Sequence, residues 1–205
     1  MKRYALALIL ALSLAPRAQS GEVFNSWRKA SDSRTGPRST LTERPAPSSR
    51  IGEYIVRVEG PKGIPRGSGV LIAHGRYIVV LSCAHLDWTK ITGVRHQGTW
   101  RPIIGYRKAR GPDLAVAYLA DQRGLSGARV RTTQARAEVI LAGYPIPNAR
   151  LTVRPGLVHQ HFGREYHLTQ NANLGDSGGP VFNNLMRVVG ILSAKQAPRD
   201  RPNPP

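Results

Sequence analysis

Short apolar runs recur about every ten residues through the middle of the chain, separated by Gly, Pro, His and charged breaks. No segment of the expected mature chain repeats apolar residues at the i, i+3, i+4, i+7 spacing of a long amphipathic helix. The pattern therefore predicts an all-β protein whose short strands fit two small barrels or one sandwich. The expected strands cover residues 53–58, 69–73, 77–82, 100–106, 114–119, 128–132, 137–142, 151–159, 164–169, 179–182 and 187–192.

The first twenty residues have the pattern of a secretory signal peptide. Lys2 and Arg3 precede the apolar run 4–15, and small residues at positions 18 and 20 favour cleavage after Ser20. The apolar run is shorter than the roughly 20 residues that a spanning helix needs, so a membrane anchor is the weaker alternative. We therefore expect residues 1–20 to be a signal peptide and the protein to be secreted, with no membrane span.

Two further segments lack the apolar residues that a folded core requires. Residues 21–50 are mostly Ser, Thr, Arg and Pro and predict a disordered basic linker or pro-segment. Residues 196–205 form a Pro-rich tail. The folded domain is thus expected over residues 51–195, which is a usual length for one domain.

The cysteine content narrows the class of protein further. Cys83 is the only cysteine among 205 residues, which excludes a disulfide framework and multi-cysteine zinc or iron–sulfur sites. It stands two residues before His85, where strand alternation predicts a small buried side chain in preference to a reactive thiol.

The charge raises the alternative of a nucleic-acid binder. Thirty Lys and Arg against twelve Asp and Glu give +18, but residues 51–193 carry only +10 of it and the basic residues are spread throughout. No zinc-finger spacing, amphipathic recognition helix or aromatic-rich basic strand accompanies the charge. We expect no specific nucleic-acid partner.

Three polar residues lie in settings suited to nucleophilic catalysis. Glycines surround Ser177, so that its turn can bring backbone N–H groups together. His85 follows a buried strand, and Asp113 begins an apolar strand where its carboxylate can accept the imidazole N–H. Each residue also has a purely structural interpretation: Ser177 as a turn serine, His85 as a capping histidine and Asp113 as a loop carboxylate. Asp87 is the nearest competing acid, but it lies too close to His85 in sequence.

These motifs together resemble the chymotrypsin-like (trypsin-like) serine peptidase family over roughly residues 51–195, in the style of short bacterial, HtrA-type members. The resemblance rests on Gly67-Ser68-Gly69, Ser82-Cys83-Ala84-His85 in place of the usual Thr-Ala-Ala-His, Pro112-Asp113-Leu114-Ala115-Val116, Gly143-Tyr144-Pro145, Gly175-Asp176-Ser177-Gly178-Gly179-Pro180-Val181 and Gly190-Ile191-Leu192-Ser193.

The resemblance implies two antiparallel six-stranded β-barrels, at about residues 51–120 and 127–195, with the active site in the cleft between them. It implies Ser177 as nucleophile, His85 as general base and Asp113 as the acid that orients His85. The N–H groups of Gly175 and Ser177 would form the oxyanion hole, and the Ser193 hydroxyl would lie near Asp113. No cofactor is expected.

The resemblance also implies a primary specificity pocket. Its bottom falls at Asn171, where trypsin has aspartate, so cleavage after Lys or Arg is not implied. The walls are expected from the remaining substrate-binding residues, which are Ala172, Leu174, Ser193, Ala194 and Lys195.

Asp176 is buried in most relatives and then needs a cationic partner. Arg50-Ile51-Gly52 resembles an activation site that could supply a freed amine, but the following strand begins almost at once. We expect an internal arginine instead, such as Arg136 or Arg154.

Two functions follow as hypotheses. The first is a secreted serine endopeptidase, periplasmic or extracellular and bacterial, that acts on protein or peptide substrates through an acyl-enzyme, with a monomer as the default. The second is a catalytically silent binding module on the same scaffold that holds an anionic cell-envelope polymer or nucleic acid.

His159, His161 and His167 also suggest a metal site, but no carboxylate or thiolate pattern accompanies them.

Overall fold

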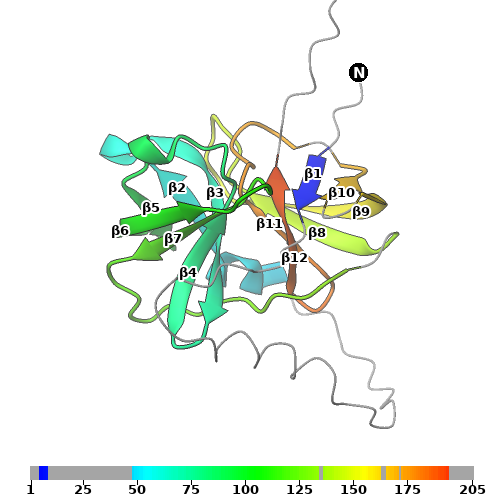
Figure 1. The fold of residues 1–205 in the computed structure, drawn as a ribbon, viewed down its shortest axis with the longest axis horizontal. Coiled ribbons are helices and arrows are strands. Elements are labelled where there is room, and N and C mark those ends of the chain that lie inside the picture. The colour runs from blue at the N-terminus through cyan, green and yellow to red at the C-terminus, as the bar shows by residue number, and fades with distance from the viewer. Residues whose placement is uncertain (1–4, 9–47, 134–135, 163–164, 171, 194–205) are drawn as a thin grey trace, which may run out of the picture. The chain divides into compact units, whose positions relative to one another are not determined.

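A computed structural model describes residues 5–8, 48–133, 136–162, 165–170 and 172–193. Within this part, twelve β-strands form two closed antiparallel barrels of six strands each, which confirms the predicted fold class (Figure 1). Three short 3-10 helices, Ser48–Glu53, Pro61–Gly63 and Trp88–Lys90, connect or precede the strands. No helix in the described ranges has the length and apolar character to cross a bilayer.

The first barrel has the strand order β2-β3-β4-β7-β6-β5. Its core contains alternate residues of these strands, such as Val56 and Val58 of β2, Leu71 of β3 and Val80 of β4. The strands are β2 (Ile55–Glu59), β3 (Pro65–His74), β4 (Tyr77–Ser82), β5 (Gly93–His96), β6 (Thr99–Lys108) and β7 (Ala115–Leu119).

Strand β3 is buried on both faces over six consecutive residues. Leu71 packs in the barrel core, whereas Ser68 and Ile72 are covered from outside by hydrogen bonds or bridges to later parts of the chain. Strands β8 (Glu138–Gly143) and β11 (Pro180–Phe182) of the second barrel contact β3. The continuous apolar run of β3 is therefore explained by its position at the junction of the barrels.

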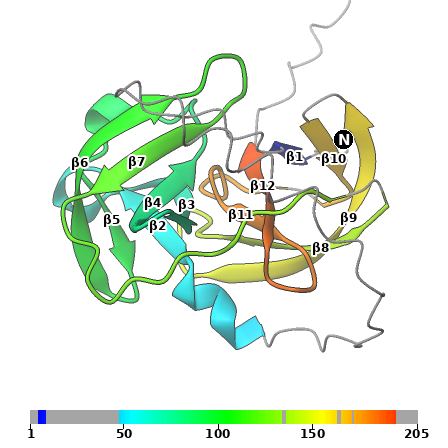
Figure 2. The ribbon, with the colours of Figure 1, turned by 60° about the horizontal axis from the view of Figure 1, so that its bottom comes forward.

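The second barrel has the strand order β1-β10-β9-β8-β11-β12 (Figure 2). Leu141, Val158, Leu168 and Leu192 are fully or almost fully buried in its core. The strands are β1 (Ala5–Leu8), β8 (Glu138–Gly143), β9 (Thr152–Phe162), β10 (Glu165–Leu168), β11 (Pro180–Phe182) and β12 (Val188–Ser193).

Strand β1 comes from the segment that the sequence predicts as a signal peptide. Ala5–Leu8 pairs with β10 on one side and with β12 on the other, both antiparallel. Cleavage after Ser20 would remove this strand and leave β10 and β12 as edges. The structure thus describes the barrel with its N-terminal segment in place, and the signal peptide stays a prediction.

Two details of the strand prediction were wrong. The segment 128–132 is not a strand: Ala128 bridges Ile72 and Val130 bridges Val188, each as an isolated parallel pair. Its apolar residues are explained by its path between the barrels, where it contacts one strand of each. Strand β5 was missed because its four residues, Gly-Val-Arg-His, have little apolar character.

Gly127 provides a test of this close passage between the barrels. An added Cβ would lie 2.2 Å from the backbone nitrogen of Ala73, so Gly127→Ala must displace backbone. We expect a loss of about 1–3 kcal/mol in the free energy of unfolding, measured by urea denaturation. Gly105→Ala is the control, because nothing lies within 4 Å of its added Cβ. Equal stability of the two variants would contradict the described packing.

Candidate active site

Ser68 connects the first barrel to the loop that carries Ser177. Its N–H donates to the Ser177 carbonyl at 2.8 Å, and its hydroxyl donates to the Gly175 carbonyl at 2.8 Å. The same hydroxyl oxygen accepts the Tyr144 N–H at 2.8 Å, while the Ser68 carbonyl accepts the Ser82 hydroxyl at 2.7 Å. Because Ser68 is fully buried, these bonds fix the loop against β3 without competition from water.

His85 and Asp113 are brought together at the end of β4 and the approach to β7. Nδ1 of His85 lies 2.6 Å from Oδ2 of Asp113, and the His85 backbone N–H donates to Oδ1 at 2.8 Å. The carboxylate thus binds both the ring and the backbone of the histidine. The His85 side chain is 36% exposed and that of Asp113 only 7%, so the imidazole is accessible while its partner is shielded.

Ser193, at the end of β12, donates its hydroxyl to Oδ2 of Asp113 from the second barrel. Burial by itself would raise the pKa of Asp113, but hydrogen bonds from His85 and Ser193 outweigh it and hold the pKa well below its usual range. Asp113 is therefore ionised at neutral pH. An ionised carboxylate can only accept, so Nδ1 of His85 must carry the proton that it shares with Asp113.

The loop around Ser177 has a glycine where the backbone requires one. Gly175 has φ +95°, and a Cβ there would lie 2.6 Å from the Tyr144 carbonyl oxygen. The Leu174 carbonyl accepts the Ile146 N–H at 2.7 Å. In a trans peptide the carbonyl and the next N–H point in opposite directions, so the N–H of Gly175 points away from Ile146.

The N–H groups of Gly175 and Ser177 have no protein acceptor among the described residues. Their neighbours do: Asp176 N–H donates to Asn173, and Gly178 N–H donates to Leu192. Two free donors beside a buried serine can bind an anionic oxygen.

Asp176 is fully buried and forms an ion pair with the Nη2 atom of Arg154 on β9. The Asn173 N–H also donates to its Oδ2 at 2.8 Å. Of the two internal arginines that the sequence suggested, the structure pairs Arg154 with Asp176. With this partner, Asp176 requires no freed amine at Ile51 to balance its charge.

The expected specificity-pocket residues are only partly described. Ala172 packs against the second core, and the Leu174 side chain is 74% exposed. The Ser193 hydroxyl points to Asp113. The specificity pocket stays a prediction. Asn171, Ala194 and Lys195 lie outside the described residues, as does the side chain of His161.

Cys83 is fully buried, and its Sγ lies 3.6 Å from Nε2 of His85. Burial and the charge of Asp113 raise the pKa of its thiol to about 12. Cys83, His85 and Asp113 bring one ligand-type atom each within 4.8 Å of one another. However, Oδ2 of Asp113 is already bound by Nδ1 and by Ser193, and the thiol is protonated. The group therefore has the geometry of a hydrogen-bonded chain.

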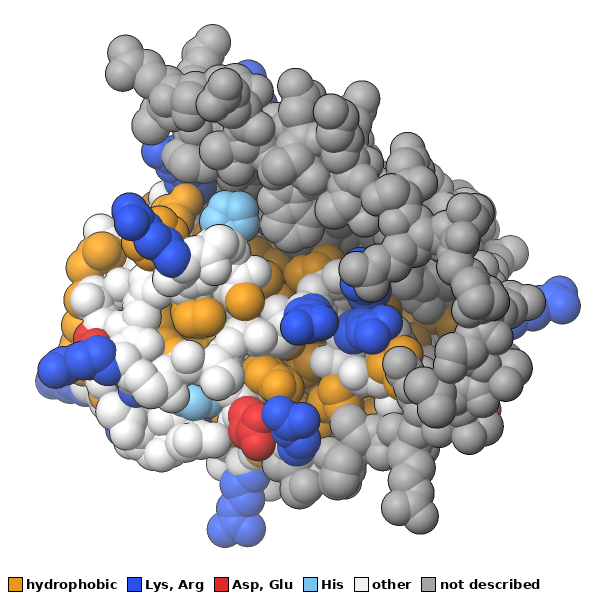
Figure 3. Space-filling view, turned by 90° about the horizontal axis from the view of Figure 1, so that it is seen from below, with side chains coloured by type: hydrophobic (Ala, Val, Ile, Leu, Met, Phe, Trp, Pro, Cys, Tyr) orange, Lys and Arg blue, Asp and Glu red, His pale blue; other side chains and the backbone are white. Residues whose placement is uncertain are grey.

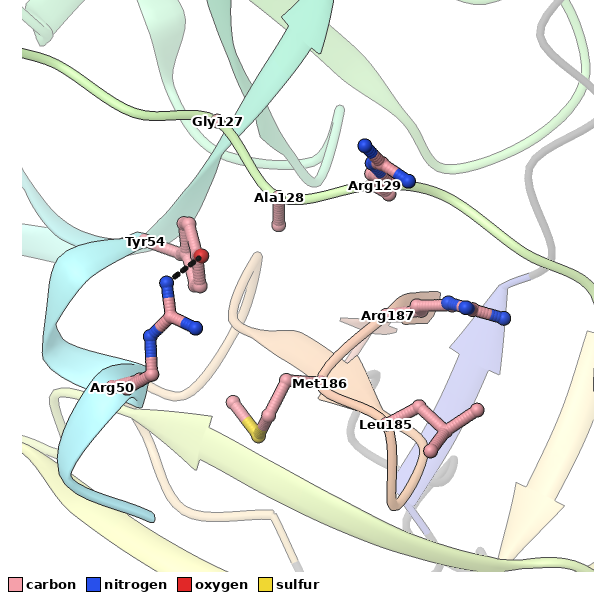
Figure 4. A pocket seen from close by; sticks show the side chains of 8 residues that line it. All are labelled: Arg50, Tyr54, Gly127, Ala128, Arg129, Leu185, Met186 and Arg187. Atoms are coloured by element: carbon pink, nitrogen blue, oxygen red, sulfur yellow. Dashed lines mark hydrogen bonds between the residues drawn. The ribbon is translucent and has the colours of Figure 1, made fainter. Parts of the chain in front are cut away.

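Away from His85 and Asp113, a hollow of about 270 Å³ has three arginines among its lining residues (Figure 4). The Arg50 guanidinium donates to the Tyr54 hydroxyl at 3.4 Å, and Arg129 and Arg187 lie on the other side. Figure 3 shows Lys and Arg at several separate points of one face, among apolar and polar side chains. The basic character is spread over this face, as the sequence suggested.

The sequence does not show the contacts of Ser68 or of Arg154. Ser68 is the centre of Gly67-Ser68-Gly69, and this motif is the signal that points to its contacts. For Asp176 the sequence offers both Arg136 and Arg154, because strand register alone does not show which arginine reaches a loop.

Two joined antiparallel six-stranded barrels are the chymotrypsin-like fold. The sequence profile of the trypsin-like peptidase domain matches residues 67–191, which is more than half of the chain. The chain belongs to this family. No curated protein sequence matches it.

Solved structures of bacterial proteases are similar to it. A serine endoprotease from Yersinia pestis aligns with a TM-score of 0.58 and 25% identity over 70% of this chain and 54% of that one. The MamO protease domain of Magnetospirillum magneticum gives 0.57 and 20%, over 72% and 87%. The Rv3671c protease of M. tuberculosis, inactive form, gives 0.54 and 16%, over 70% and 78%.

Arg154→Met tests the partner of Asp176. Asp176 is fully buried and the Arg154 side chain is 23% exposed, so removing the arginine leaves a buried charge uncompensated. We expect a loss of about 3 kcal/mol in unfolding free energy by urea denaturation, at the low end of the range for buried pairs. Arg123→Ala is the control, because Arg123 pairs with Asp121 at the surface and its side chain is 92% exposed. A stability loss in Arg154→Met no larger than in the control would contradict the assignment.

Proposed function

We propose that this trypsin-like peptidase domain is a secreted serine endopeptidase whose catalytic residues are His85, Asp113 and Ser177. Ser177 Oγ attacks the peptide carbonyl while Nε2 of His85 accepts its proton. The same proton then goes to the leaving amine, which leaves an acyl-enzyme on Ser177. A water molecule, activated by His85, hydrolyses that ester and restores the site.

The observation that carries this proposal is the paired contact of Asp113 with the ring and the backbone N–H of His85, at 2.6 and 2.8 Å. A surface carboxylate would meet a histidine through one flexible contact. Here the acid is shielded, held ionised and joined by Ser193 from the other barrel. Such an acid fixes the imidazole tautomer and stabilises the imidazolium that forms when Ser177 loses its proton.

The free N–H groups of Gly175 and Ser177 support an oxyanion hole at the same serine. Removing one such donor costs about 10²–10³ in turnover in enzymes of this kind. The Leu174 and Asp176 carbonyls share peptide groups with these two N–H donors. They accept hydrogen bonds from Ile146 and Gly179 at 2.7 and 2.8 Å, so the donors are oriented before substrate arrives.

Secretion and substrate class are part of the proposal. The leader pattern of residues 1–20 supports export, and cleavage after Ser20 would leave a second barrel of β8 to β12 with an open seam between β10 and β12. The peptidase family supports a protein or peptide substrate.

A silent binding module remains the second candidate. The described hydrogen bonds include none between Ser177 Oγ and His85, and the arginine-lined hollow offers a place for an anionic polymer. Hydrogen bonds at active sites without substrate are often long or poorly aligned, however, so this observation alone does not favour the second candidate over the first.

A fluorophosphonate probe separates the two candidates. We expect wild-type protein to gain one phosphonyl group, mapped to Ser177 by peptide mass spectrometry, and Ser177→Ala to gain none. His85→Ala should slow labelling by at least about 100-fold, because the nucleophile loses its base.

Ser126→Ala serves as the matched control, since Ser126 is an exposed loop serine. It should label like the wild type. Folded wild-type protein that is not labelled, yet binds polyanions in a salt-sensitive manner that Ser177→Ala retains, would favour the binding module instead.

A further inference from the structure

Two donors are candidates for the lone pair on Nε2 of His85. Under the proposed function, on which this inference rests, that lone pair accepts the Ser177 proton. In the structure its hydrogen-bond neighbour is the Cys83 thiol, 3.6 Å away, and no described hydrogen bond joins it to Ser177. A neutral imidazole has one acceptor nitrogen, so the thiol and the hydroxyl compete for it.

The bond at Nδ1 of His85 determines which atom donates in the contact between the thiol and Nε2. Asp113 is ionised and accepts from Nδ1, so in the neutral imidazole Nδ1 carries the ring proton and Nε2 is the acceptor. The thiol must then be the donor. Its raised pKa, about 12, keeps it protonated throughout the neutral range and able to donate.

The thiol has little freedom to move aside. Cys83 is fully buried in the first core, beside Leu86 and Trp88. Its backbone carbonyl accepts the Trp88 indole N–H at 3.0 Å, which fixes this turn of the chain. The contact is therefore broken by movement of the exposed imidazole and not by movement of Cys83.

We propose that Cys83 is a positioning residue that holds Nε2 of His85 in a resting hydrogen bond, and that this bond must open before His85 can accept the Ser177 proton. Only the molecules in which the imidazole has moved away from the thiol can then react with substrate. The apparent rate of acylation is the intrinsic rate multiplied by that fraction.

The effect of removing the donor has a definite direction and size. A thiol is a weak donor, so its hydrogen bond should lie in the lower part of the net range for hydrogen bonds in proteins. A bond of that strength changes the fraction of molecules with a free Nε2 by about 2- to 5-fold. Cys83→Ala should therefore label with a fluorophosphonate about 2–5 times faster than wild type. With a peptide substrate, kcat should rise by the same factor while KM stays unchanged, because the contact does not involve substrate.

Cys83→Ser separates this role from simple packing. Serine keeps a hydroxyl donor in nearly the same volume, so it should label close to the wild-type rate. Cys83→Ala that labels no faster than wild type, or Cys83→Ser that labels as fast as Cys83→Ala, would overturn the inference. If neither the wild type nor any of the folded variants is labelled, the proposed function fails instead.

A second measurement requires neither activity nor a Cys83 variant. Because the chain has one cysteine, its infrared S–H stretching band reports Cys83 alone. We expect the frequency of a hydrogen-bonded thiol in wild type and a shift to higher frequency in His85→Ala, where the acceptor is gone. An unchanged band would overturn the thiol contact itself, whether or not the protein is a peptidase.

Discussion

Buried hydrogen bonds across the junction of the two barrels hold the candidate site together. Ser68 of the first barrel binds the carbonyls of Gly175 and Ser177 in the second, and Ser193 of the second barrel binds Asp113 of the first. Because these groups are buried, losing a partner would leave unsatisfied polar atoms, at about 1–3 kcal/mol each. These bonds therefore fix the barrels relative to each other near Asp113 and the loop that carries Ser177.

A buried charge fixes the loop from its other side. Asp176 has no exposed surface and is bound by Arg154 and by the Asn173 N–H. Its side chain anchors the turn through Oδ2, while the N–H groups of Gly175 and Ser177 have no described acceptor. Arg154 thus supplies a positive charge to Asp176 from within the folded chain, although Oδ1 of Asp176 is buried without a hydrogen-bond partner among the described residues. Cys83 adds a separate constraint, because its thiol contacts Nε2 of His85, the nitrogen that accepts the Ser177 proton in the proposed mechanism.

The sequence allowed the all-β class to be predicted because alternation and turn residues are local signals. Local settings single out His85, Asp113 and Ser177, and the resemblance assigns their roles; the structure places His85 against Asp113. The sixth strand of the second barrel could not be predicted, since Ala5–Leu8 reads as a leader by composition and pairs with strands over 150 residues away. Likewise, strand alternation indicated that Cys83 would be buried, but the side of the imidazole that it contacts depends on the ring's orientation.

The central claim is that Ser177 is a nucleophile facing two donors that the loop holds free. A crystal structure of the protein after reaction with a fluorophosphonate tests it most directly. The account predicts phosphorus bonded to Ser177 Oγ, with the phosphonyl oxygen within hydrogen-bond distance of the N–H groups of Gly175 and Ser177. A phosphonyl group on another residue, or an oxygen directed away from both donors, would contradict it.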